Sequence, residues 1–275
     1  MARKTTIIAE IGENHHGAWD IAAKMLEEAA ARGADIVKFQ SYRMENFSPD
    51  DPDYDWFKRV ALPDEKHLEF KQRAEALGVE FMSSPFTPER AEFLCEKVGC
   101  QSIKVASGVM MSFEMLDVIN AHGGIPVRRV YLSTGMATID EIHRALEHLD
   151  KINEVTILHC VTQYPARPDQ ANLRCIPTLI KEFSGHAVGY SDHVPGLVAC
   201  VTAVALGATV LEKHFTFSRH LPGTDHQCAM LPEELTGLCR QVEQIEQLLG
   251  TGKKKPNPEE LEIRDFVRSR FRGGK

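Results

Sequence analysis

The chain has 275 residues, a formal net charge of −7, 43% hydrophobic residues and 26% charged residues. This composition is typical of a globular protein, and the length suits one large domain or two of common size. The net negative charge argues against nucleic acid or an anionic membrane surface as the main partner, because the longest basic run is only Lys253–Lys255.

The number of cysteines and the length of the apolar segments indicate the cellular compartment. The seven cysteines are odd in number and form no Cys-x-x-Cys pair, which favours a reducing environment. The N-terminal apolar run stops at Glu10, too early for the core of a signal peptide. The most apolar stretch, 197–211, is interrupted by Gly207 and is shorter than the roughly 20 residues that span a bilayer. We therefore expect a cytoplasmic protein with no membrane partner.

Short β-branched runs alternate with amphipathic segments along the whole chain. Strands are expected, in chain order, over 5–12, 34–41, 79–86, 102–108, 128–135, 154–161, 187–193 and 209–215. Helices are expected after them over 16–32, 64–77, 88–98, 112–122, 138–150, 172–184, 196–206 and 232–250. Eight consecutive strand–helix units predict a TIM (β/α)8 barrel, whereas five or six would suggest an open sheet.

Local signals support this register. Thr87-Pro88 has the form of an N-cap followed by proline at the first helical position, and Thr138 with Glu141 forms a capping box. After about residue 250 the chain becomes charged and contains two prolines, followed by a helical pattern around 259–270. We expect a barrel domain over 1–250 and a charged, partly helical tail over 251–275.

Polar side chains at the carboxyl ends of the strands are informative, because the active site of a TIM barrel lies there. Lys38 and Lys104 lie within apolar strands, where burial of an ammonium group is unfavourable unless an anion pairs with it. Lysines together with hydroxyl groups and glycine-flanked amides are typical of a phosphate or carboxylate site. The sequence therefore predicts an anion-binding pocket, although a single strand lysine or histidine is commonly structural.

Histidines give the second signal. His214 ends the eighth strand and His226 lies in the next loop, so two imidazoles can converge on one divalent metal. Their spacing forms no compact motif such as His-Glu-x-x-His. Cys160, next to His159, is a further candidate ligand, but a small buried side chain is the commoner role of such a cysteine.

Nine segments occur in register with these positions: AEIGENHHG, VKFQ, SSPF, KVASG, LSTGMA, LHCVTQYP, VGYSDH, EKHFT and GTDH. Over about residues 5–235 they resemble the N-acetylneuraminate (sialic acid) synthase family. The resemblance implies condensation of phosphoenolpyruvate with an aldose such as N-acetylmannosamine, giving a 2-keto-3-deoxy sugar acid and phosphate. It also implies a divalent metal, with Mn²⁺ expected before Mg²⁺ or Co²⁺, and a homodimer. It does not identify the aldose.

The resemblance assigns roles at the phosphoenolpyruvate end. Lys38 would bind the phosphate or carboxylate at the catalytic centre, with Gln40 beside it. Ser107 and Ser133 would hydrogen-bond the same anion, and Lys104 would add positive charge.

The resemblance also assigns the metal and the acid/base groups. His214 and His226 would hold the metal ion. Glu10 would act as an acid/base or water-orienting group, and Asp192 is a further candidate at the sugar end. The division of roles between these two carboxylates stays open.

One departure from the family concerns its second domain. Family members usually continue into an antifreeze-like domain that lends an arginine to a partner's sugar site, whereas this chain ends at Lys275 after KKPNPEELEIRDFVRSRF. We therefore expect the barrel domain only. Ala229 also stands where family members often have serine.

Alternatives to the synthase remain. One is a sugar-phosphate-binding or regulatory barrel with little activity of its own, which needs a partner to supply the missing domain. An unrelated lyase or isomerase that uses the same metal is another, but it leaves the anion-binding residues unexplained. The long connection over 43–63 is expected to be either a lid over the mouth or a rigid surface excursion.

Overall fold

A computed structural model describes residues 4–270 of the chain. Eight parallel strands close into a barrel in chain order, with β1 paired to both β2 and β8. The strands are β1 (Thr6–Glu10), β2 (Ile36–Ser41), β3 (Glu80–Pro85), β4 (Ser102–Val105), β5 (Arg129–Ser133), β6 (Glu154–Cys160), β7 (Ala187–Asp192) and β8 (Val210–His214). The predicted TIM barrel is confirmed.

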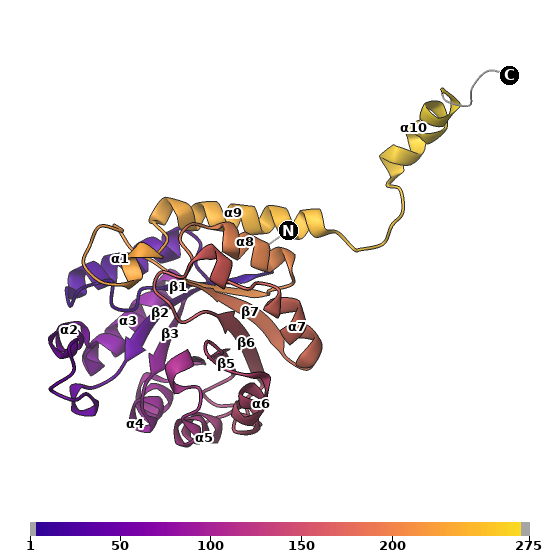
Figure 1. The fold of residues 1–275 in the computed structure, drawn as a ribbon. Helices are drawn as coiled ribbons and strands as arrows, with labels where there is room; N and C mark the ends of the chain where they lie inside the picture. The colour runs from indigo at the N-terminus through magenta and orange to yellow at the C-terminus, as the bar shows by residue number, and fades with distance from the viewer. Residues whose placement is uncertain (1–3, 271–275) are drawn as a thin grey trace.

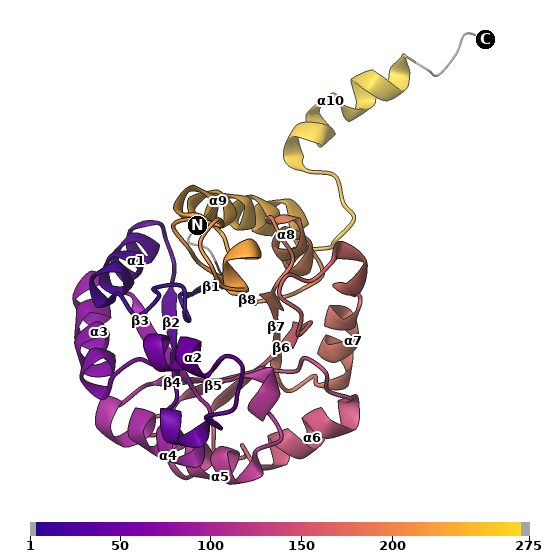
Figure 2. The same ribbon diagram turned by 60° about the vertical axis from the view of Figure 1, so that its left-hand side comes forward.

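Helices form a ring around the strands (Figure 2). They are α1 (Trp19–Ala31), α3 (Asp64–Leu77), α4 (Pro88–Glu92), α5 (Phe113–Ala121), α6 (Ile139–Glu147), α7 (Cys175–Glu182), α8 (Val198–Ala205) and α9 (Pro232–Leu249). α4 continues as a π-helical turn over Phe93–Val98. Beyond α9, the tail helix α10 (Pro258–Ser269) stands clear of the barrel (Figure 1). No helix within residues 4–270 is both long and apolar enough to cross a membrane.

The two capping signals act as the sequence predicts. Thr87 Oγ1 accepts a hydrogen bond from the N–H of Arg90 at the start of α4, and Thr138 and Glu141 form the capping box of α6. Gly78 ends α3 in the left-handed conformation, which glycine adopts without steric cost. These contacts depend only on neighbours in the sequence, so they set helix boundaries before any packing is considered.

The connection over 43–63 is more ordered than the sequence indicates. It contains a 3₁₀ turn (Met44–Asn46) and an additional helix, α2 (Tyr54–Val60). Trp56 and Phe57 of α2 line the cavity described below, so this helix lies over the strand ends.

Strand periodicity divides the core into two parts. Side chains alternate between the barrel interior and the helical ring. One interior layer is entirely buried and consists of Ile8, Ile36, Met82, Tyr131, Leu158 and Val210. Residues two positions further along these strands also face inward, and they are largely polar: Glu10, Lys38, Ser84, Ser133, Cys160 and Glu212. An apolar layer therefore supports a polar layer at the carboxyl end of the barrel.

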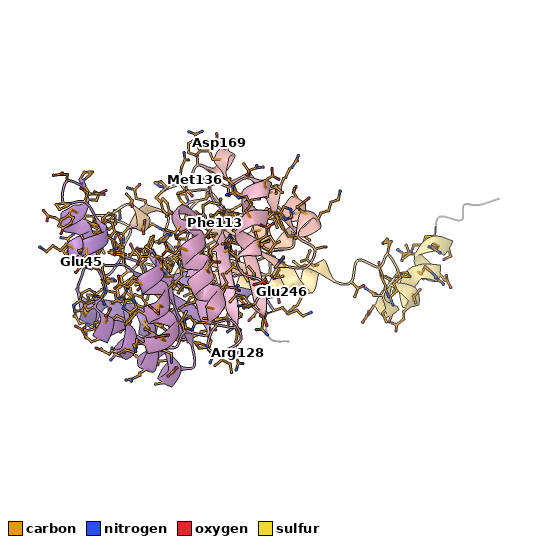
Figure 3. The ribbon with its side chains drawn as sticks, turned by 90° about the horizontal axis from the view of Figure 1, so that it is seen from below. Glu45, Phe113, Arg128, Met136, Asp169 and Glu246 are labelled. Atoms are coloured by element: carbon orange, nitrogen blue, oxygen red, sulfur yellow. The ribbon has the colours of Figure 1, made fainter. Side chains whose placement is uncertain are left out.

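Figure 3 shows the two ends of the barrel at opposite edges of the molecule. Arg128, just before β5, lies at one edge of the molecule, and Met136, just after β5, lies at the opposite edge. Asp169, which follows β6, lies on the same side as Met136. The functional loops are those on the Met136 side.

Candidate active site

A cavity of about 480 Å³ opens at the carboxyl end of the barrel. We call its strand residues the floor: Glu10, Lys38, Gln40, Ser84, Lys104, Ser133, Cys160, Ser191, Glu212 and His214. We call its loop residues the mouth: Glu13, Asp53, Trp56, Phe57, Phe86, Ala106, Ser107, Gly108, Thr162, Tyr164, His193, Gly223, Thr224 and Asp225. All eight strands contribute to the floor, as the TIM-barrel prediction requires.

A network of buried ion pairs lies at the centre of the floor. Lys38 Nζ is 3.0 Å from Glu10 Oε2 and 3.6 Å from Glu212 Oε2. Lys104 Nζ is 3.1 Å from Glu212 Oε1, which also accepts a hydrogen bond of 2.9 Å from Ser191 Oγ. Each of the four charged side chains is at most 5% exposed. The two lysines are therefore held side by side through a shared carboxylate, Glu212.

The network separates the pKa values of its two carboxylates. Burial raises the pKa of Glu10, and the nearby charge of Lys38 offsets this only in part. Burial also acts to raise the pKa of Glu212, but the charges of Lys104 and Lys38 outweigh it and bring the pKa down to about 2. Glu212 is therefore a permanent anion, while Glu10 is the carboxyl group suited to exchange a proton.

The pKa values of the two lysines also diverge. For Lys38, burial acts to lower the pKa, but Glu10 and Glu212 together raise it above its usual range. For Lys104, burial prevails and lowers the pKa. Lys38 is thus the more firmly charged of the two.

Small hydroxyl groups line the same cavity as the lysines. Lys38 Nζ donates to Ser84 Oγ at 3.2 Å, and Ser107 Oγ accepts from the N–H of Gly135 at 3.0 Å. Ser133 Oγ and Thr162 Oγ1 are buried and have no hydrogen-bond partner among residues 4–270. Because buried polar atoms are rarely unpaired, these two hydroxyls are suited to bind the oxygens of an anion.

Gly135 is necessary for this arrangement. A Cβ atom at this position would lie 2.2 Å from Thr162 Oγ1 and 2.8 Å from Ser107 Oγ. Cys160 Sγ also lies here, 3.1 Å from Ser107 Oγ. The thiol therefore contacts the hydroxyl cluster and not a histidine pair.

The two histidines predicted to bind metal occupy different environments. Among residues 4–270, His214 Nδ1 has no hydrogen-bond partner, and it is 3.4 Å from Asp225 Oδ2. His226 is fully buried, with Nδ1 2.8 Å from Thr216 Oγ1 and Nε2 2.7 Å from His16 Nε2. His214 lines the cavity, whereas His226 lies against His16 and is not part of the lining.

No group of three or more histidine, cysteine, aspartate or glutamate side chains within residues 4–270 is arranged to hold a metal ion. The imidazole of His214 and the carboxylate of Asp225 nevertheless fit a divalent cation that takes its remaining ligands from water and substrate. Mg²⁺ is commonly bound in this way.

The sequence prediction places Asp192 in the site, but the structure places it outside the cavity lining. Its Oδ2 accepts a hydrogen bond of 2.7 Å from Lys213 Nζ and one of 3.1 Å from Cys200 Sγ, and its Oδ1 accepts from Tyr190 at 3.0 Å. Since Ser191 faces the cavity, strand alternation directs Asp192 outward, toward α8. The structure therefore does not bring Asp192 to the site, and its carboxylate has an internal ion-pair partner. His159 is likewise outside the cavity lining, with Nε2 2.8 Å from the carbonyl oxygen of Ala171.

Four carboxylates of the cavity lining have no role in the sequence prediction: Glu13, Asp53, Glu212 and Asp225. Glu212 is two residues before His214, so strand alternation could have identified it. Glu13 follows β1 and accepts hydrogen bonds from Trp56 Nε1 at 2.6 Å and Tyr42 OH at 3.1 Å. Burial raises the pKa of Glu13 to about 7. Because its partners come from a distant loop, no local pattern marks Glu13.

The protein is similar to known proteins in both sequence and fold. The profile of the NeuB family matches residues 25–254. The chain is 36% identical to the N,N'-diacetyllegionaminic acid synthase of Campylobacter jejuni, an alignment that covers 97% of this chain and 84% of the relative. It is 34% identical to the N-acetylneuraminate-9-phosphate synthase of Mus musculus, covering 93% of this chain and 74% of the relative.

A solved structure gives the same result. The crystal structure of the N-acetylneuraminic acid synthetase of Leptospira borgpetersenii, in complex with citrate, superposes with a TM-score of 0.88 at 33% identity. The superposition covers 98% of this chain and 93% of that chain. On the combined match of profile, sequence and fold, the chain belongs to the NeuB family.

Proposed function

We propose that this protein catalyses the metal-dependent condensation of phosphoenolpyruvate with an aldose. The observation that carries the proposal is the pair of buried lysines, Lys38 and Lys104, held together by Glu212 at the floor of the cavity. Relatives named as legionaminic acid and N-acetylneuraminate-9-phosphate synthases support the same class of reaction.

The proposed reaction forms one C–C bond and releases phosphate by C–O cleavage. C3 of phosphoenolpyruvate attacks the aldehyde carbon and forms the new C–C bond, and the aldehyde oxygen takes up a proton. Water adds to the electron-poor C2 and releases a proton. The tetrahedral intermediate then breaks its C–O bond to phosphate while its hydroxyl oxygen forms the C2 ketone, and the hydroxyl proton leaves with the phosphate. The products are a 2-keto-3-deoxy sugar acid and inorganic phosphate.

Side chains of the cavity bind the phosphate and carboxylate groups of phosphoenolpyruvate in this proposal. Lys38 and Lys104 bind the phosphate and carboxylate by charge-assisted hydrogen bonds, and Ser133 adds a hydroxyl that lacks an internal partner. Gln40 of the floor and Ser107 of the mouth also line the cavity and are the remaining proposed anion-binding residues. Because these groups are fixed before the substrate arrives, they stabilise developing charge without reorganisation.

Glu10 is the proposed acid/base. It lies 3.0 Å from Lys38, and therefore next to the proposed anion site, where water must add. Burial raises its pKa, which brings proton exchange closer to neutral pH. We do not retain Asp192 in this role, because its carboxylate is occupied by Lys213.

His214 and His226 are the proposed metal-binding residues, with Asp225 beside His214. His226 Nδ1 contacts Thr216 and its Nε2 contacts His16 in this structure, so His226 would exchange one of these contacts for the metal. These residues would hold a divalent cation, Mn²⁺ before Mg²⁺ or Co²⁺, which would supply Lewis acidity at the aldehyde oxygen. His214 lines the cavity, and its Nδ1, 3.4 Å from Asp225 Oδ2, makes no hydrogen bond within residues 4–270, which supports this assignment.

The proposal includes a homodimer. Helix α10 leaves the barrel with Leu261, Ile263 and Phe266 at least 43% exposed, and apolar side chains of this kind favour a protein partner. The oligomeric state can be measured by light scattering.

Phosphate release tests the function. Protein, Mn²⁺ and phosphoenolpyruvate are mixed with a panel of aldoses, and the 2-keto-3-deoxy acid is identified by mass spectrometry. We expect phosphate release that depends on both the aldose and the metal. Tight binding of phosphoenolpyruvate without turnover of any aldose would instead favour a binding or regulatory barrel.

A further inference from the structure

A buried ion pair lies just outside the cavity lining, on the side of the helical ring. Asp192 of β7 and Lys213 of β8 are partners in the strand register, and Lys213 Nζ donates to Asp192 Oδ2 at 2.7 Å. Both side chains are at most 1% exposed. The preceding residues, Ser191 and Glu212, line the cavity, so strand alternation directs the ion pair away from it. The proposed reaction uses neither charge directly.

Stability alone does not account for this pair. Taking two charges out of water is costly, and an apolar pair of similar volume is often as stable. The carboxylate of Asp192 also accepts hydrogen bonds from Tyr190 OH at 3.0 Å and Cys200 Sγ at 3.1 Å. Tyr190 and Cys200 belong to the hydrophobic core. A buried polar network whose members are hydrogen-bonded specifies a geometry more closely than apolar contacts do. The pair is therefore suited to fix the position of the chain around it.

The pair holds the chain on both sides of His193. Asp192 precedes this histidine in the sequence, and Val194 follows it. The N–H of Val194 donates to Asp192 Oδ1 at 2.9 Å, and its carbonyl oxygen accepts from Lys213 Nζ at 2.7 Å. One carboxylate and one ammonium group thus fix the backbone around His193.

The imidazoles of His193 and His214 lie next to each other in the cavity wall. Among residues 4–270 they are the two histidines that line the cavity, and their ring centroids are 5.5 Å apart. His193 directly follows Asp192, and His214 directly follows Lys213. Because each ring is attached to the residue next to one member of the ion pair, a shift of either strand end would displace the rings relative to each other.

We propose that Asp192 and Lys213 are positioning residues, whose ion pair fixes the imidazoles of His193 and His214 in the cavity wall. This inference rests on the proposed function, in which His214 binds the metal. Neither member of the pair touches substrate or metal, so the pair acts through the two histidines. The lysines of the floor come from β2 and β4, and binding of phosphoenolpyruvate should therefore not depend on the pair.

Variants of Lys213 test the proposal. Lys213→Met keeps the length of the side chain but loses the charge and both hydrogen bonds, whereas Lys213→Arg keeps the charge and the donors. We expect Lys213→Met to lower kcat and to weaken Mn²⁺ binding, measured by electron paramagnetic resonance, by about tenfold or more each. The KM for phosphoenolpyruvate should change by less than about twofold, because the floor is separate. Lys213→Arg should restore most of the kcat and of the Mn²⁺ affinity.

A second variant and a control complete the test. Asp192→Asn removes the charge at the other end of the pair with little change of shape, and should show the same division between kcat and KM. Glu80→Gln breaks the ion pair with Arg129 at the opposite end of the barrel and should leave kcat and Mn²⁺ affinity unchanged. Wild-type kcat and Mn²⁺ affinity in the folded Lys213→Met and Asp192→Asn variants would overturn the proposal. Failure of both variants to fold would also overturn it, because the pair would then be structural.

A crystal structure of the Lys213→Met variant separates this inference from the proposed function. The ring centroids of His193 and His214 should move relative to each other by about 1 Å or more, a displacement large enough to impair catalysis. Displaced rings in a protein whose wild type releases no phosphate with any aldose would contradict the synthase but support the positioning role. Unmoved rings in an active synthase would support the proposed function and contradict the positioning role.

Discussion

The floor and the mouth of the cavity are built in different ways. On the floor, Lys38, Lys104, Glu10 and Glu212 come from strands of a closed, hydrogen-bonded barrel, and each charge is buried beside an opposite one. At the mouth, side chains come from separate loops and meet through single contacts, such as Trp56 with Glu13. A rigid floor suits the chemistry that family members share, and variable loops suit the choice of sugar.

The largest expected effect is the loss of turnover when the metal is removed from its proposed site, which lies between the floor and the mouth. His214 ends β8 and Asp225 belongs to the mouth. Removal of the metal by a chelator should lower turnover by about 10³-fold or more, because Lewis-acid polarisation is worth several kcal/mol. Turnover should return on adding Mn²⁺.

The His214→Ala and His226→Ala double variant should lose Mn²⁺ binding, measured by electron paramagnetic resonance. His143→Ala is the control, since its ring is exposed on α6. Full activity in the chelated protein, or retained Mn²⁺ affinity in the double variant, would contradict the proposed metal site.

The second largest expected effect is a loss of stability when the ion-pair network of the floor is broken. Glu212→Ala should lower the free energy of unfolding by about 3–5 kcal/mol, because it leaves two buried lysines without their shared counter-charge. Glu212→Gln keeps the shape and should still be destabilising. Chemical denaturation measures both, with Glu147→Ala on the exposed face of α6 expected to change stability by about 0.5 kcal/mol or less. An unchanged stability in both Glu212 variants would show that the network is not structural.

Lys38→Ala tests whether the floor binds substrate. Loss of one charge-assisted contact to a buried anion should weaken phosphoenolpyruvate binding by about 1.5–3 kcal/mol, or roughly 10- to 150-fold. Calorimetry without an acceptor measures this affinity, with Lys24→Ala, an exposed lysine of α1, as the control. If the folded Lys38 variant binds as tightly as the wild type, Lys38 serves only as an ion-pair partner.

Glu13→Gln tests the mouth through pH. Burial raises the folded-state pKa of Glu13 from 4.5 to about 7, so the folded protein holds this proton more tightly than the unfolded chain. The stability that this provides is complete below about pH 4.5 and is lost as pH rises through about 7. The variant should therefore lose less stability than the wild type between pH 5 and pH 8 in denaturation curves. Parallel pH profiles would mean that Glu13 titrates normally.

The smallest effect concerns mobility of the mouth. Addition of phosphoenolpyruvate and metal should slow amide hydrogen exchange over 43–63, if this connection acts as a lid. The segment over Pro168–Gln170, which does not line the cavity, provides an internal reference. Unchanged exchange over 43–63 would identify a rigid surface excursion, in keeping with the order of α2.

Much of the fold was accessible from the sequence because its signals are local. Strand–helix alternation predicts the eight units, and Thr138 with Glu141 marks a helix start through contacts within one turn. Lys38 and Lys104 could be identified as site residues because a lysine inside an apolar strand needs a partner, and the structure places both on the floor.

Tertiary structure decided which polar residues meet. The run Ser191, Asp192, His193 is polar at every position, so the sequence pattern does not reveal which of them face inward. Closure of the barrel directs Ser191 toward Glu212 and Asp192 toward Lys213. Both contacts join residues 21 positions apart in sequence.

The mouth depends still more on distant contacts. Glu13 acquires its environment from Trp56, 43 residues away, and His226 lies against His16, 210 residues away. The hydrogen bonds and burial that set these environments form only when the loops converge on the closed barrel. Local sequence therefore determined the elements and the two lysines of the floor, whereas only the assembled barrel determined which carboxylates pair with these lysines and which charges meet at the mouth.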